Sequence, residues 1–163
     1  MLFQWCAARV PVGLAVRQVY GWLVDDHGRV LLQDVGGGYN LPGGSPEPAD
    51  AGMADTLARE AMEESQVRIA GAVYLGYELV VAEGSAPAGL ARMVARISGF
   101  RPRQADPDGG RLLGRFMTCF ADAPGLLCWG PSGAAQAEAA ARVAARWWAL
   151  PVDAPTAASS YVG

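Results

Sequence analysis

Cysteine is scarce in this 163-residue chain. Its three cysteines, Cys6, Cys119 and Cys128, include no pair spaced as Cys-x-x-Cys. An odd number without such a pair argues against a disulfide framework and against a zinc knuckle. We therefore expect reduced thiols packed in the fold, as in a cytoplasmic protein.

An excess of positive charge is also absent, because the formal net charge at pH 7 is -3. Surfaces that bind the phosphate backbone of nucleic acids are usually basic, so no nucleic acid polymer is expected as a partner. A small phosphorylated ligand is compatible with this charge, because a bound divalent cation supplies positive charge locally.

An apolar run of membrane-spanning length is missing as well. Residues 1–16 are mostly apolar, but they lack a basic start and are interrupted by Arg9 and Pro11. We expect neither a signal peptide nor a membrane span. The length fits a single domain over residues 1–163, with 1–12 and 153–163 as loosely held ends.

Apolar periodicity predicts an α+β fold. The expected strands cover residues 16–25, 29–34, 39–44, 74–82, 91–97 and 115–120. The expected helices cover residues 50–65 and 134–148. Because strands and helices alternate along the chain, we expect a mixed β-sheet with helices on its faces.

Three glutamates, Glu60, Glu63 and Glu64, mark the first expected helix. Their i, i+3 and i+4 spacing places them on one face. A separate apolar face is expected from Ala54, Leu57, Ala58 and Ala61. Like charges so close repel one another, and a hard divalent cation, which prefers oxygen ligands, would offset the repulsion. A solvated face with Arg59 paired to Glu63 is the alternative.

A glycine-rich turn, Leu41-Pro42-Gly43-Gly44, precedes this helix, and Glu47 lies in the intervening loop. A loop that enters a helix N-terminus offers backbone N–H groups and a favourable dipole to an anion. Turn, loop and acidic helix in this order predict a phosphate site with a metal ion beside it.

The same residues resemble the Nudix box, GX5EX7REUXEEXGU, in which U is apolar. Gly44 matches the first glycine, and the matches to the rest of the box are Arg59, Glu60, Glu63, Glu64 and Val67. Four departures occur. Asp50 stands at the first glutamate, the interval from Asp50 to Arg59 is one residue longer, Ala61 is small for its apolar position, and Gln66 replaces a glycine.

The resemblance implies a Nudix-like mixed β-sheet sandwiched between helices. It implies a hydrolase that uses Mg²⁺, or Mn²⁺, to cleave a phosphoanhydride in a nucleoside diphosphate linked to another moiety, with a small nucleotide-type molecule as substrate. The implied metal ligands are Glu60, Glu63, Glu64 and Gly44, and the implied catalytic residues are Glu63, Glu64 and Arg59. Arg59 would orient the carboxylates by pairing with them.

Two other functions stay open. One is a Nudix-fold module that binds a nucleotide without turning it over, and the other is an acidic helix in a non-enzymatic domain. Candidates for the general base are Asp106, Asp108 and Glu138, against ordinary turn or surface roles. Substrate identity and oligomeric state are not predicted, although a homodimer is the commonest assembly.

Substrate contacts are expected from residues outside the core of the box. Glu47 and Tyr39 are candidates for a loop contact and for ring stacking. Arginines around the expected loop 100–111 are candidates for phosphate or ribose contacts, namely Arg96, Arg101, Arg103 and Arg111. Solvated arginines are the alternative.

Overall fold

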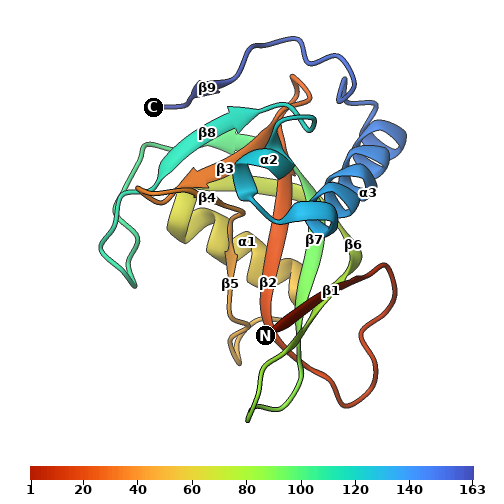
Figure 1. Ribbon diagram of the computed structural model, residues 1–163. Helices are drawn as coiled ribbons and strands as arrows, with labels where there is room; N and C mark the ends of the chain where they lie inside the picture. The colour runs from red at the N-terminus through yellow and green to blue at the C-terminus, as the bar shows by residue number, and fades with distance from the viewer.

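Nine β-strands form one mixed sheet in the computed structural model of the chain, which describes residues 1–163 (Figure 1). The strands are β1 (Leu2–Cys6), β2 (Ala15–Val24), β3 (Val30–Asp34), β4 (Tyr39–Asn40), β5 (Gly43–Gly44), β6 (Val67–Val81), β7 (Ala88–Phe100), β8 (Gly114–Thr118) and β9 (Ser160–Tyr161). Their order is β1-β6-β7-β2-β3-β8-β9, with β4 on β3 and β5 on β2. The helices are α1 (Met53–Ser65), α2 (Ala123–Leu127) and α3 (Gly130–Trp148).

The centre of the sheet is the parallel pair β2 and β7, and the other pairs are antiparallel. Successive side chains of a strand point to opposite faces, so β2 contributes to two cores. Val19 and Leu23 pack with α1 on one face, whereas Trp22 and Val24 pack with α2 and α3 on the other. The expected α+β fold, a mixed sheet between helices, is confirmed.

The contact between α1 and β2 sets the height of the helix above the sheet. Leu57 and Ala61 are completely buried. A Cβ at Gly21 of β2 would lie 2.6 Å from Cδ1 of Leu57, so the missing side chain lets the helix approach closely. Ala54 and Ala58, expected on the apolar face, are exposed, because the buried side of α1 is rotated toward its carboxylates.

Short segments of both ends of the chain, residues 2–6 and 160–161, pair with strands of the sheet. β1 is antiparallel to β6 along residues 2–6. β9 pairs with β8, and Arg115 donates hydrogen bonds to the carbonyls of Val162 and Gly163. Local composition does not reveal such pairing between segments that are distant in sequence. None of the helices is long and apolar enough to cross a membrane.

We expect Leu57→Ala to lower the free energy of unfolding by about 2–5 kcal/mol, because it opens a cavity between α1 and the sheet. Chemical denaturation measures this loss, and exposed Ala58→Ser serves as the control on the same helix. A loss well below about 1 kcal/mol would contradict the packing of α1 on Gly21.

Candidate active site

The glycine turn is held between β2 and α1. A Cβ at Gly43, whose φ is +155°, would lie 2.1 Å from the carbonyl oxygen of Val19. A Cβ at Gly44 would lie 2.2 Å from Oε1 of Glu60. Both glycines therefore permit a close approach of backbone, the first to the sheet and the second to an acidic side chain of the helix.

Glu64 faces this turn. Its Oε2 accepts hydrogen bonds from Nε2 of Gln33 at 2.7 Å and from the backbone N–H of Gly43 at 3.1 Å. Burial raises the pKa of Glu64, and the negative charges of Glu60 and Asp106 act in the same direction. The turn is thus fastened directly to the last turn of the acidic helix.

Arg59 binds the acidic residues on both sides of it. Its Nη1 donates to Glu60 at 2.9 Å and to Glu63 at 3.1 Å. Its Nε and Nη2 donate to the carboxylate of Asp50 at 3.2 and 3.1 Å, and Nη2 also reaches the carbonyl of Ser45 at 2.8 Å. The guanidinium group holds the pKa of Asp50 well below its usual range.

Each of the three helix carboxylates keeps one oxygen free of protein hydrogen bonds. These oxygens are Oε2 of Glu60, Oε1 of Glu63 and Oε1 of Glu64, since the bonds above use the other oxygen of each group. Glu60 is only 9% exposed, and burial raises its pKa. No three acidic, histidine or cysteine side chains lie close enough together to hold a metal ion by themselves.

The segment after β7 carries two of the expected bases toward this helix. The charge of Asp106 contributes to the raised pKa of Glu64, and that of Asp108 to the raised pKa of Glu60. Asp106 also accepts the backbone N–H of Asp108 at 3.0 Å, as a turn residue does. Glu138 instead pairs with Arg142 on α3, across the sheet.

Of the expected substrate contacts, only Glu47 lies in the carboxylate cluster, 3.4 Å from Arg59. Tyr39 packs on Phe116, with ring centres 5.4 Å apart. Arg111 donates to the carbonyl of Val35. Arg96 pairs with Asp26 at 2.8 Å beside the β2–β3 turn. The last three side chains are thus engaged away from the glutamates.

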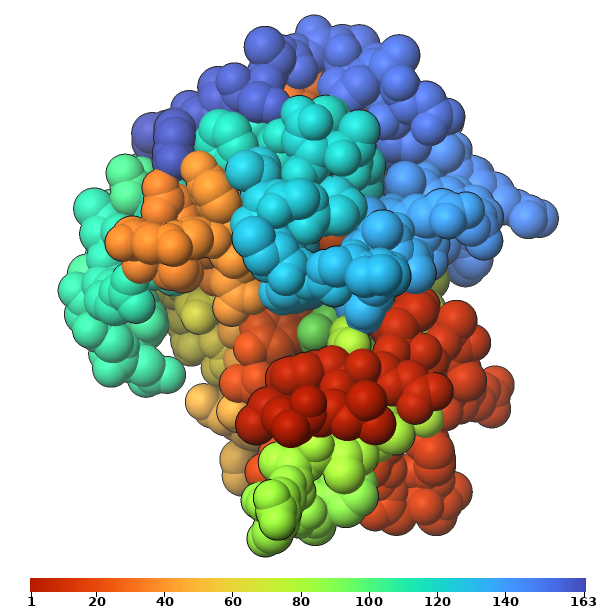
Figure 2. All heavy atoms as spheres, viewed as in Figure 1, coloured from red at the N-terminus to blue at the C-terminus, as the bar shows by residue number.

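A pocket that sequence reasoning missed lies on the opposite face of β2. It has a volume of about 670 Å³, and the residues that line it include Tyr20, Asn40, Glu78, Arg92, Trp129 and Ser132. Figure 2 shows it as a hollow between the N-terminal strand in dark red and the start of α3 in light blue. Tyr20 pairs in register with Gly43, so the pocket adjoins the glycine turn.

Arg92 forms the base of this pocket. Its guanidinium carbon lies 4.9 Å from the ring centre of Tyr20 and 5.0 Å from that of Trp129. Its Nε donates to Gln136 at 2.9 Å, and burial lowers the pKa of Arg92 to about 10. Glu78 accepts hydrogen bonds from Gln136 and from Ser132. No sequence spacing brings these residues together.

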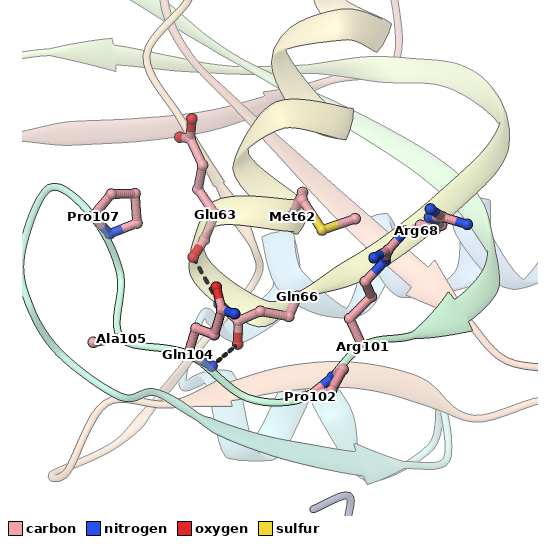
Figure 3. A pocket seen from close by; sticks show the side chains of 9 residues that line it. All are labelled: Met62, Glu63, Gln66, Arg68, Arg101, Pro102, Gln104, Ala105 and Pro107. Carbon is pink, nitrogen blue, oxygen red and sulfur yellow. Dashed lines mark hydrogen bonds between the residues drawn. The ribbon is translucent and has the colours of Figure 1, made fainter.

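Gln66, the residue that replaces the box glycine, ends α1 in the left-handed conformation, with φ 50° and ψ 47°. Its Nε2 donates to the carbonyl of Glu63 at 2.8 Å, and its Oε1 accepts the backbone N–H of Gln104 at 3.0 Å (Figure 3). A glycine could make neither side-chain bond, so Gln66 links the end of the helix to the segment after β7.

The fold of this chain is similar to the folds of several proteins of known structure. No protein-family model and no curated protein matches the sequence. The pyrophosphohydrolase BsRppH of Bacillus subtilis is 25% identical over 64% of this chain, with a TM-score of 0.55. The Mutator MutT protein of Bacillus halodurans is 22% identical over 71%, and the Nudix hydrolase of Nitrosomonas europaea is 16% identical over 77%, with TM-scores of 0.54 and 0.58.

The matches also cover different shares of these proteins. They span 64% of the Bacillus subtilis protein, 76% of the Bacillus halodurans protein and 87% of the Nitrosomonas europaea protein. What the three share with this chain is the arrangement of a mixed sheet between helices.

Because the turn at Gln66 is left-handed, Gln66→Gly relieves backbone strain of about 1 kcal/mol. The substitution also removes two hydrogen bonds that contribute about 1 kcal/mol each. We therefore expect Gln66→Gly to leave the free energy of unfolding unchanged or to lower it by about 1 kcal/mol, as measured by denaturant titration. A clear gain would show that the two side-chain bonds contribute nothing. Gln66→Asn, which tolerates this turn but is shorter, is the matched control.

Proposed function

Since this chain is a Nudix-fold protein that keeps the arginine and the glutamates of a Nudix box, we propose that it is a Mg²⁺-dependent hydrolase. Its reaction would be cleavage of a phosphoanhydride in a nucleoside diphosphate linked to another moiety. The observation that carries the proposal is that Glu60 and Glu64 lie against the Gly43–Gly44 turn, with Glu63 beside them on the helix, and that each of the three has an unbonded oxygen.

The donor set suits magnesium. Mg²⁺ usually takes one or two carboxylates and completes its coordination with water and substrate phosphates, so a closed protein cage is not required. Glu60 and Glu64, with the carbonyl of Gly44, would hold the ion, and Glu63 would join them. Bound there, Mg²⁺ would polarise a phosphoryl oxygen and lower the pKa of water. Manganese, with similar oxygen ligands, is the alternative ion.

The protein groups around this site have distinct proposed roles. Arg59 orients the glutamates, because one guanidinium group binds Glu60, Glu63 and the loop residue Asp50. Asp106 or Asp108 accepts a proton from the attacking water, supported by the effect of their charges on the helix glutamates. Glu47 contacts the substrate from the loop.

The pocket at Arg92 supports a nucleoside as one part of the substrate. Tyr20 and Trp129 provide aromatic surface for a planar base. Ser132, Asn40 and Glu78 are polar residues that line the same pocket. This geometry favours Tyr20 and Trp129 over Tyr39, Arg96 and Arg111 as substrate contacts. The three free cysteines support a cytoplasmic location.

A nucleotide panel tests the proposal. Nucleoside triphosphates, ADP-ribose, dinucleoside polyphosphates and nucleotide sugars are assayed for phosphate or nucleotide release with and without Mg²⁺. Metal-dependent turnover of at least one supports the hydrolase. Binding without turnover would overturn it in favour of a nucleotide-sensing module. The absence of both binding and turnover would point to a non-enzymatic domain.

We expect Glu64→Gln to abolish Mg²⁺-dependent turnover and to leave the fold intact. The amide oxygen can still accept the hydrogen bonds from Gln33 and Gly43, while the charge that would bind the ion is lost. Initial rates and the melting temperature without metal measure the two effects. Glu138→Gln, at an exposed residue on α3, is the matched control, and retained activity in Glu64→Gln would place the metal elsewhere.

For the nucleoside pocket, we expect Trp129→Ala to raise KM for the nucleotide about tenfold, because base–aromatic stacking contributes about 1–3 kcal/mol. Trp147→Ala changes an exposed tryptophan of α3 and should leave KM unchanged. An unaltered KM in Trp129→Ala, measured by steady-state kinetics, would show that the nucleoside does not bind in this pocket.

A further inference from the structure

A second pocket, of about 700 Å³, lies between the C-terminal end of α1 and the segment after β7 (Figure 3). The side chains that matter for its chemistry are Glu63, Gln66, Arg68 and Arg101. We call it the helix-end pocket. It opens beside Glu63, one of the three helix glutamates, and lies apart from the Tyr20–Trp129 pocket, with which it shares no residue.

Arg68 and Arg101 form one wall of this pocket, and Figure 3 shows their side chains next to each other. In the antiparallel β6–β7 register, Arg68 is opposite Gly99. Arg101 follows Gly99 by two residues, so Arg68 and Arg101 are diagonal neighbours on one face of the sheet. Both arginines are exposed. Neither has a carboxylate within 4.0 Å or a side-chain hydrogen bond to the protein, unlike Arg59, Arg92 and Arg96.

Two neighbouring guanidinium groups without a counterion repel each other, and an anion between them removes the repulsion. The guanidinium plane presents paired N–H donors that match the oxygens of a phosphate group. Glu63, the acidic group of the pocket, is itself paired with Arg59 at 3.1 Å. The wall at Arg68 and Arg101 is therefore the cationic side of the pocket.

The backbone that carries Arg101 is held in place by hydrogen bonds. The carbonyl of Gln66 accepts the backbone N–H of Arg101 at 2.8 Å. Arg115, which is buried, donates to the carbonyl of Arg101 at 2.8 Å. The side chain of Gln66 adds the bond to Gln104 at 3.0 Å. A fixed backbone leaves only the arginine side chains to be ordered when a ligand binds, which lowers the entropy cost of binding.

We propose that the helix-end pocket binds a phosphate-bearing group of the substrate through Arg68 and Arg101. The inference rests on the proposed hydrolase and deepens it, because it states the chemistry of the second moiety. The nucleoside lies in the Tyr20–Trp129 pocket, the scissile anhydride lies at the helix glutamates, and the second moiety extends along Glu63. The favoured substrates carry further phosphate there, whereas nucleotide sugars with an uncharged sugar do not use the arginines.

Inorganic tripolyphosphate in metal-free buffer is the direct probe, because it reports anion binding without turnover. Isothermal titration compares the original protein with the double variant Arg68→Gln/Arg101→Gln. The control is Arg17→Gln/Arg146→Gln, which removes two charges from other exposed arginines. We expect affinity to fall at least tenfold in the first double variant and to be unchanged in the control. Equal affinities in both variants would overturn the proposal.

Kinetics separate this inference from the proposed function. We expect Arg68→Gln/Arg101→Gln to lower kcat/KM at least tenfold for adenosine tetraphosphate, through KM, and less than threefold for ADP-glucose. Equal losses on both substrates would overturn the role of the arginines in binding phosphate. If the unaltered protein turned over no nucleotide, the proposed hydrolase would fail, while the tripolyphosphate titration would still decide whether the pocket binds phosphate.

Discussion

The ion-pair network of Arg59 is the constraint on which the site depends. A single guanidinium group contacts the loop at Ser45 and Asp50 and the helix at Glu60 and Glu63. Without this cation, carboxylates this close would repel one another. The same network fixes the loop to the helix, even though the chain has one residue more here than the box pattern. Asp50 still reaches Arg59, and its other contacts, to Thr56 and to the N–H of Glu47, close the loop around it.

The part of the site that could be predicted is local. Glu60, Glu63 and Glu64 share one helix face by spacing alone, and the following residue that caps the helix, Gln66, was identified by its departure from glycine. The buried arc of α1 was misjudged, since Ala58 is exposed. A helical wheel predicts the buried face from apolar residues alone. It does not account for the close approach of Gly44 to Glu60, which turns that carboxylate inward.

Residues joined by tertiary structure lay beyond sequence reasoning. Arg92, Glu78 and Gln136 come from β7, β6 and α3, and only the crossing of α3 over the sheet forms their network. Arg101 was a candidate as one of several arginines, but Arg68 was not, because their adjacency depends on the β6–β7 register. At the ends of the chain, β1 and β9 likewise form only through pairing with distant strands.

Arg115 connects parts of the molecule that are far apart in sequence. Its buried guanidinium group donates to Ser65 at the end of α1, to Arg101 in the pocket wall, and to Val162 and Gly163 in the tail. Losing the tail would leave buried N–H donors without acceptors beside the carboxylate helix. Val162 and Gly163, which contact no proposed ligand, thus help to hold both the end of α1 and the backbone of Arg101 in place through Arg115.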